Sequence, residues 1–103
     1  MKLSSSGPRN AADGVIHFPI LECWNPMTKC VSIAADVSGR RVLCRIAETV
    51  IKKRYAAQDG APTAVVAANR REIEAAATGL IQRKAFAADG MIDIRFEDFR
   101  EVG

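Results

Sequence analysis

The chain has 103 residues, of which 49% are hydrophobic and 26% charged, and its formal net charge is +3. This composition is typical of an ordinary globular chain, and the length suits one domain whose core needs no metal or disulfide support. The small positive charge permits an acidic partner without requiring one, and an odd number of cysteines, three, argues against a disulfide framework.

Residues 1–14 contain Ser, Gly and Pro without a hydrophobic period, so we expect a disordered leader before a single α+β domain over residues 15–103. The leader lacks the apolar stretch of a secretory signal. No apolar run elsewhere is long enough to span a membrane. We therefore expect a cytoplasmic protein that has no membrane partner.

Residues 15–18 predict a short strand that places Val15 and His17 on one face, because side chains alternate along a strand. Residues 24–26, Trp-Asn-Pro, predict a turn, since proline holds the preceding residue extended. We expect Cys23, immediately before this turn, to be packed in the interior.

Residues 30–46 predict a β-hairpin whose two-residue turn is Ser38 and Gly39, and this turn places Asp36 opposite Arg41. One face is apolar and carries Val31, Ile33, Ala35, Val37, Val42, Cys44 and Ile46. The other is mostly polar and carries Cys30, Ser32, Ala34, Asp36, Arg41, Leu43 and Arg45. We expect helices to cover the apolar face only. Because Cys30 and Cys44 point to opposite faces, a disulfide between them is excluded.

Two helices are expected next, over residues 48–58 and, from Pro62, to about residue 88. The apolar side of the longer helix is formed by Val66, Ile73, Ala77 and Leu80. Arg70 and Glu74 are an i,i+4 ion pair. Such a helix would be about 40 Å long, which is more than one sheet of this size needs. It must therefore bend, fray at its end, or project toward a partner.

Residues 91–97 predict a last strand. Its inward residues are Ile92, Ile94 and Phe96, and its outward residues are Met91, Asp93 and Arg95. We expect Phe99 to cover one end of the core. The predicted order is strand, strand, strand, helix, helix, strand (β-β-β-α-α-β). This is an α+β fold in which two helices pack on one face of a mainly antiparallel sheet.

Several short motifs are distributed along residues 15–98. They are Ile16-His17-Phe18, Trp24-Asn25, Cys44-Arg45-Ile46, Asn69-Arg70-Arg71-Glu72-Ile73-Glu74 and Ile92-Asp93-Ile94. Together they resemble the small bacterial family filed as domain of unknown function 1488. The resemblance implies a compact bacterial α+β protein, and it implies no activity, cofactor or site residue.

The sequence contains no recognisable motif for catalysis, metal binding or a cofactor. His17 is the single histidine, and no Ser, Cys or acid stands near it in a known nucleophile arrangement. Cys23 and Cys30 are too far apart for a zinc-ligand pair. Gly60 and Gly90 stand alone at predicted helix ends rather than in a phosphate-binding loop. We therefore do not expect an enzyme. The third hypothesis is an enzyme whose active site has no recognisable sequence motif.

The basic segment 40–54 makes nucleic acid the second hypothesis. The candidate contacts are Arg40, Arg41, Arg45, Lys52 and Lys53. Sheets that read RNA normally present aromatic rings for stacking, and the outward positions here carry none. A basic middle and an acidic end can also neutralise each other within the fold.

The first hypothesis is a non-enzymatic interaction or accessory module that uses the uncovered sheet face. The candidate residues are Val15, His17, Arg41, Leu43, Arg45, Met91 and Arg95. Arginine, methionine and aliphatic side chains on a flat surface are typical of a protein interface. We expect self-association or an unknown protein partner. The alanine-rich helix offers a second close-packing surface, although its small residues also let it lie tightly on the sheet.

Overall fold

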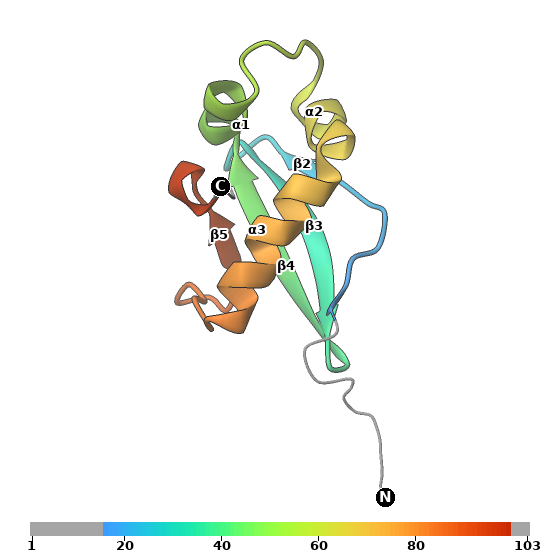
Figure 1. Ribbon diagram of the computed structural model, residues 1–103, viewed down its shortest axis with the longest axis vertical. Helices are drawn as coiled ribbons and strands as arrows, with labels where there is room; N and C mark the ends of the chain where they lie inside the picture. Colours follow the sequence, from blue (N-terminus) through green and yellow to red (C-terminus); the bar gives the residue numbers. More distant parts are fainter. Residues whose placement is uncertain (1–15, 100–103) are drawn as a thin grey trace, which may run out of the picture.

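In the computed structural model, residues 16–99 are described, and they form one five-stranded sheet with helices on one side (Figure 1). The elements in chain order are β1 (Ile16–His17), β2 (Cys23–Asn25), β3 (Cys30–Val37), β4 (Arg40–Ala47), α1 (Glu48–Arg54), α2 (Pro62–Ala68), α3 (Arg70–Gln82), β5 (Ile92–Ile94) and the 3₁₀ helix η1 (Phe96–Asp98). The α+β class is confirmed, but four strands rather than three precede the helices, and there are three α-helices among these residues. The expected leader, residues 1–14, lies outside them. None of the helices described is long and apolar enough to cross a membrane.

The predicted hairpin is confirmed residue by residue. Asp36 lies opposite Arg41, and Ile33 lies opposite Cys44. Ser38 and Gly39 have φ values of 50° and 82°, so both turn residues are left-handed, as a type I′ turn requires. Ile33 is 1% exposed. The in-and-out alternation of β3 therefore runs as expected, with the apolar face under the helices.

The predicted turn at residues 24–26 is wrong, because residues 23–25 form β2 and pair with the first half of β3. The turn follows β2 directly and covers residues 26–29. The side chain of Asn25 accepts hydrogen bonds from the backbone N–H groups of Met27 and Thr28, which closes it. Cys23 is paired with Ser32, which places it on the uncovered face, and it is exposed rather than packed.

The long predicted helix is two helices that meet at Asn69. The Asn69 backbone leaves the helical region (φ −120°, ψ 27°), and its side-chain amide donates to the carbonyl of Val65 at 2.7 Å. Such a side-chain bond competes with the helical ladder. At the other end Lys84, at φ 57°, follows the last turn, and N–H groups beyond Gln82 bond back to the carbonyls of residues 80 and 81. This left-handed cap ends α3 before residue 88. The first helix also ends early, at Arg54.

The last strand, β5, is shorter than predicted and runs parallel to β4, so the sheet is mixed. The helices carry the chain back along the sheet, and β5 therefore starts at the same end as β4. The prediction that Phe96 faces the core is wrong. It belongs to η1 and is 37% exposed, with the ammonium of Lys53 lying 4.4 Å from its ring centre. Phe99 is buried instead and packs edge-to-face against Tyr55.

The core lies between the inner face of the sheet and the helices, and Figure 1 shows α3 crossing β3 and β4. The predicted stripe of the long helix is confirmed, since its four members are all buried: Val66, Ile73, Ala77 and Leu80. Burial of such aliphatic side chains is the main force that holds helices on a sheet. The opposite side of the sheet, which we call the outer face, is where the candidate site lies.

Candidate functional site

Three cross-strand rows of side chains cross the outer face. The tip row, nearest the hairpin turn, contains His17, Asp36 and Arg41; the central row contains Ala34 and Leu43; the acidic row contains Ser32, Arg45 and Asp93. The rows lie two residues apart along each strand, about 7 Å. An apolar row therefore separates two charged ones.

A shallow hollow of about 330 Å³ opens on this face beside the central row. Its lining residues are Leu21, Cys23, Trp24, Asn25, Pro26, Ser32, Ile33, Ala34, Arg41 and Leu43. Ala34 points outward as predicted but is nearly buried, because it is a small side chain among larger neighbours. Leu21 and Leu43 remain 53% and 37% exposed. The hollow thus has an apolar rim that faces solvent.

The tip row is held by an ion pair between Arg41 and Asp36. The Arg41 Nε donates to Asp36 Oδ1 at 2.9 Å, as the predicted register required. This hydrogen bond holds the pKa of the Asp36 carboxyl below its ordinary value. His17 lies opposite Asp36 and is exposed. The side chain of Arg41 still keeps 57% of its surface exposed.

The acidic row holds one guanidinium between two carboxylates. Arg45 donates from Nε to Asp93 Oδ1 at 2.7 Å and from Nη2 to Asp93 Oδ2 at 3.0 Å. Its Nη1 donates to Asp89 Oδ2 at 3.0 Å. The backbone N–H of Met91 and the Arg45 guanidinium lower the pKa of Asp89. Arg45 is therefore fully engaged, and the cluster carries one more negative than positive charge.

Arg70, at the start of α3, anchors the segment that forms one wall of the hollow. Its guanidinium donates to the carbonyl oxygens of Pro19 and Leu21 and to the carboxylate of Glu22. It also binds Glu74, as predicted. The connection between β1 and β2 is thus fixed to the helix layer, and Leu21 is presented at the rim.

The predicted interaction residues are only partly brought together. His17, Arg41, Leu43 and Arg45 share the outer face. Met91 precedes β5 and is half-buried. Arg95 follows β5 at the start of η1, with its Nε 3.8 Å from Glu97. Val15 lies outside the described residues.

The sequence interpretation missed Leu21 and Trp24, because residues 23–25 were taken as a turn. The apolar pair Ile20-Leu21, placed between proline and glutamate in a connecting segment, is the signal that could have revealed this wall.

The candidate nucleic-acid contacts do not form one surface. Arg41 and Arg45 are on the outer face, whereas Lys52 and Lys53 are on α1. Lys52 lies 3.5 Å from Glu48, and Lys53 lies over Phe96. Arg40 stands at the hairpin tip and is exposed. Most of these cations already have a negative or aromatic neighbour.

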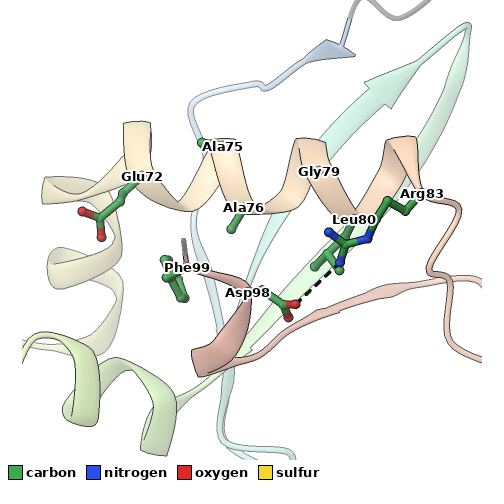
Figure 2. A pocket seen from close by; sticks show the side chains of 8 residues that line it. All are labelled: Glu72, Ala75, Ala76, Gly79, Leu80, Arg83, Asp98 and Phe99. Atoms are coloured by element: carbon green, nitrogen blue, oxygen red, sulfur yellow. Dashed lines mark ion pairs between the residues drawn. The ribbon is translucent and has the colours of Figure 1, made fainter. Parts of the chain in front are cut away.

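A second hollow, of about 200 Å³, lies between α3 and η1 on the helix side (Figure 2). Small side chains of α3, Ala75, Ala76 and Gly79, line it together with the ring of Phe99. Figure 2 shows Arg83 and Asp98 paired at one end, where Nη2 and Oδ1 are 3.8 Å apart. Glu72 lines the hollow too, and its Oε1 accepts hydrogen bonds from Arg54 and Tyr55.

The three cysteines are free and occupy different environments. Cys44 is buried in the core, and burial raises the pKa of its thiol to about 11. Cys30 is half-buried and Cys23 is exposed. Within residues 16–99, no group of three or more His, Cys, Asp or Glu side chains is arranged to hold a metal ion.

Comparison with known proteins places the chain in a family. Residues 16–94 match the family model described as protein of unknown function (DUF1488). The chain belongs to the DUF1488 family. A solved structure, a protein of unknown function from the same family in Shewanella loihica PV-4, is 24% identical and has a TM-score of 0.71. The alignment covers 78% of this DUF1488 chain and 92% of that one, and shows that the fold is shared. No curated protein matches the sequence.

Proposed function

We propose that this DUF1488 protein is a non-enzymatic interaction module that binds another protein through the outer face of its sheet. The observation that carries the proposal is the distribution of exposed large apolar side chains. In residues 16–99 these are Ile20, Leu21, Trp24, Met27, Leu43, Phe86 and Phe96. Three of them, Leu21, Trp24 and Leu43, line the outer-face hollow. Large apolar surface gathered at one place favours an interface.

The polar groups around this apolar surface support a protein partner over a polyanion. Arg45 is surrounded by two carboxylates, and Arg41 is paired with Asp36. A phosphate backbone would have to compete with these carboxylates for each guanidinium. An interface with an apolar centre and a rim of arginine and acid has the usual composition of protein–protein contacts.

An enzymatic role has weaker support in the same geometry. Burial shifts the pKa of Cys44 upward, which is the opposite of what a nucleophilic thiolate requires. His17 and Cys23 lie in separate rows of the outer face, opposite Asp36 and Ser32 respectively. The two side chains are therefore not placed to act together as a base and a nucleophile.

The proposal is tested by photo-crosslinking in the cells that make the protein. A benzophenone amino acid replaces Leu43 on the outer face or, as the matched control, Phe86, an exposed aromatic residue after α3. We expect a discrete crosslinked protein band from position 43 and none from position 86. Absence of a protein adduct at 43, or the same adducts at both positions, contradicts the proposal. A nuclease-sensitive adduct at 43 would favour the nucleic-acid alternative.

A further inference from the structure

We infer that the hollow on the outer face binds one apolar amino-acid residue of the partner, which pairs through its own peptide N–H and C=O with the backbone of Ala34. This inference rests on the proposed function, because it names the group that the partner supplies to the same surface. Three observations carry it: an interruption in the edge of the sheet, the unpaired backbone of Ala34 at that interruption, and the apolar residues around it.

The edge of the sheet beside β3 is interrupted in its middle. Strand β1 pairs with residues 36–37 of β3, and β2 pairs with residues 30–32. Residues 33–35 lie between these two pairings. The connection from β1 to β2 has five residues, 18–22, to span these three, so it does not continue the ladder and runs apart from β3 (Figure 1).

The connection is held in this position from the helix side. The guanidinium of Arg70 donates to the carbonyl oxygens of Pro19 and Leu21. These carbonyl groups are therefore engaged by α3 rather than by the neighbouring strand. Proline also has no N–H to give to a ladder. The interruption is thus a fixed feature of the edge.

The backbone of Ala34 faces this interruption. In a hairpin with a two-residue turn, the residues that flank the turn exchange both backbone hydrogen bonds, and every second residue beyond them does the same. Val37, Ala35 and Ile33 therefore direct their N–H and C=O groups to β4, whereas Ala34 directs its own to the other side, between β1 and β2. Within residues 16–99, no backbone group of the connection bonds to Ala34.

The free N–H and C=O of Ala34 lie in a recess and not on an open edge, since Ala34 is 5% exposed and lines the hollow. A buried backbone donor and acceptor without protein partners favour a ligand that satisfies both. One extended amino-acid residue does so, because its own C=O and N–H bond to both groups at once, as in an antiparallel pair. Peptides that add to a sheet edge use the same bonds.

The length of the interruption limits the ligand to about one residue. The flanking pairs, at Asp36 and Ser32, are four residues apart along β3, or about 14 Å. A longer strand would collide with β1 or β2, so the tip of a partner's loop must supply the residue. Leu21, Trp24 and Leu43 line the hollow, which suits an apolar side chain such as that of leucine.

The first test is native-state hydrogen exchange of the full chain, followed by NMR at each backbone amide. We expect the Ala34 amide to exchange at least about a hundredfold faster than the amides of Ile33 and Ala35, which lie beside it in the same strand and bond to β4. Equal protection of the three amides would mean that Ala34 already has a partner, and would overturn the inference.

The second test is titration with N-acetyl-leucine N-methylamide, a capped single residue. We expect it to shift the Ala34 amide signal and to slow the exchange of that amide. The control ligand is the analogue in which an ester oxygen replaces the leucine N–H, so that it cannot donate to the Ala34 carbonyl. It should bind at least about threefold more weakly. Equal binding of the two ligands, or no binding of the first, contradicts the pairing.

Two variants of the connection locate the binding site. The side chains of Ile20 and Leu21 are both exposed, but only Leu21 lines the hollow. We expect Leu21→Asp to abolish binding of the capped leucine and Ile20→Asp, the matched control, to leave it unchanged. Circular dichroism confirms that both variants fold. Binding that survives in both variants, or is lost in both, contradicts the assignment to this hollow.

These results are separable from the crosslinking at position 43. If the capped leucine fails to bind while position 43 still crosslinks to a protein, the interaction module stands and this inference fails. If the capped leucine binds at Ala34 while position 43 crosslinks to nothing, the recess takes a free small amide. That outcome overturns both the proposed function and the partner as the source of the residue.

Discussion

Arg70 and Glu22 form an ion pair that joins the start of α3 to the connection between β1 and β2, and their side chains are only 13% and 16% exposed. The same guanidinium also binds two carbonyl oxygens of that connection. One side chain therefore fixes the wall of the outer-face hollow relative to the helices.

We expect Arg70→Met to lower the free energy of unfolding by about 2 kcal/mol or more, since it leaves a largely buried carboxylate without its partner. Arg71→Met is the matched control, because Arg71 is exposed, and it should change stability by less than about 0.5 kcal/mol. Urea unfolding measures both. Trp24 is the single tryptophan and lines the hollow, so its emission should shift to longer wavelength in the Arg70 variant alone. Equal stability losses in the two variants would contradict the anchoring role.

Two glycines provide a comparison in which the same substitution has opposite effects. A Cβ added at Gly79 or at Gly39 meets no heavy atom within 4 Å. Gly79 lies inside α3, where alanine is the better helix former, so Gly79→Ala should stabilise the protein by about 1 kcal/mol. Gly39 has φ +82°, so Gly39→Ala should destabilise it by about 1 kcal/mol. Thermal unfolding of both variants tests these two expectations. A loss of stability in Gly79→Ala would show that the second hollow, between α3 and η1, tolerates no Cβ at this position.

The cysteines should differ sharply in reactivity. At about pH 8, iodoacetamide should modify Cys23 in the folded protein and leave Cys44 untouched, because Cys44 is buried and its pKa is raised to about 11. Mass spectrometry of tryptic peptides measures the labelling, and urea-unfolded protein, in which all three react, is the control. Burial favours the neutral form of the Cys44 thiol. The contribution of the buried neutral thiol to the free energy of unfolding is therefore complete below the ordinary thiol pKa and is lost as pH rises toward 11. Rapid labelling of Cys44 in the native state would contradict its core position.

Glu72 should contribute to stability in an acid-sensitive way. Hydrogen bonds from Arg54 and then from Tyr55 lower the pKa of its carboxyl. A depressed carboxyl pKa stabilises the fold above the unfolded value and ceases to do so as pH falls through the folded value. We expect Glu72→Gln to be less stable than wild type near pH 6, with a smaller further loss between about pH 5 and pH 3. Glu97→Gln is the control, since Glu97 has only a 3.8 Å contact with Arg95. Parallel pH profiles for wild type and Glu72→Gln would refute the prediction.

The hairpin was predictable because its determinants are local. Alternation fixes the faces of β3 and β4, and the Ser38-Gly39 turn fixes their register. The break at Asn69 was not predictable, since the Asn69 amide also bonds to Gln58, which lies in the connection between α1 and α2. The direction of β5 likewise depends on how the helices cross the sheet. Alternation alone placed Phe96 inward, but η1 begins at that residue and Phe99 takes the buried position instead.

The candidate site was predictable only where the alternation of side chains along a strand decides which face a residue occupies. Arg41, Leu43 and Arg45 share the outer face as expected. The carboxylate that neutralises Arg41 is local, but those that neutralise Arg45 lie far along the chain, Asp93 being 48 positions after it. The same separation divides Arg70 from Glu22, so the wall of the hollow depends on a contact that no local pattern reveals.

The parallel pairing of β5 with β4 has a consequence for the way the chain assembles. Strand β4 can zip onto β3 through a two-residue turn, but its other edge stays open until the whole helical segment has been made and has returned β5 to it. Closing so long a loop is slow, so β5 is expected to dock last. A nascent chain that stalls before Met91 would leave the backbone edge at Cys44 and Ile46 ready to pair with another molecule, which makes this edge the aggregation hazard of the fold.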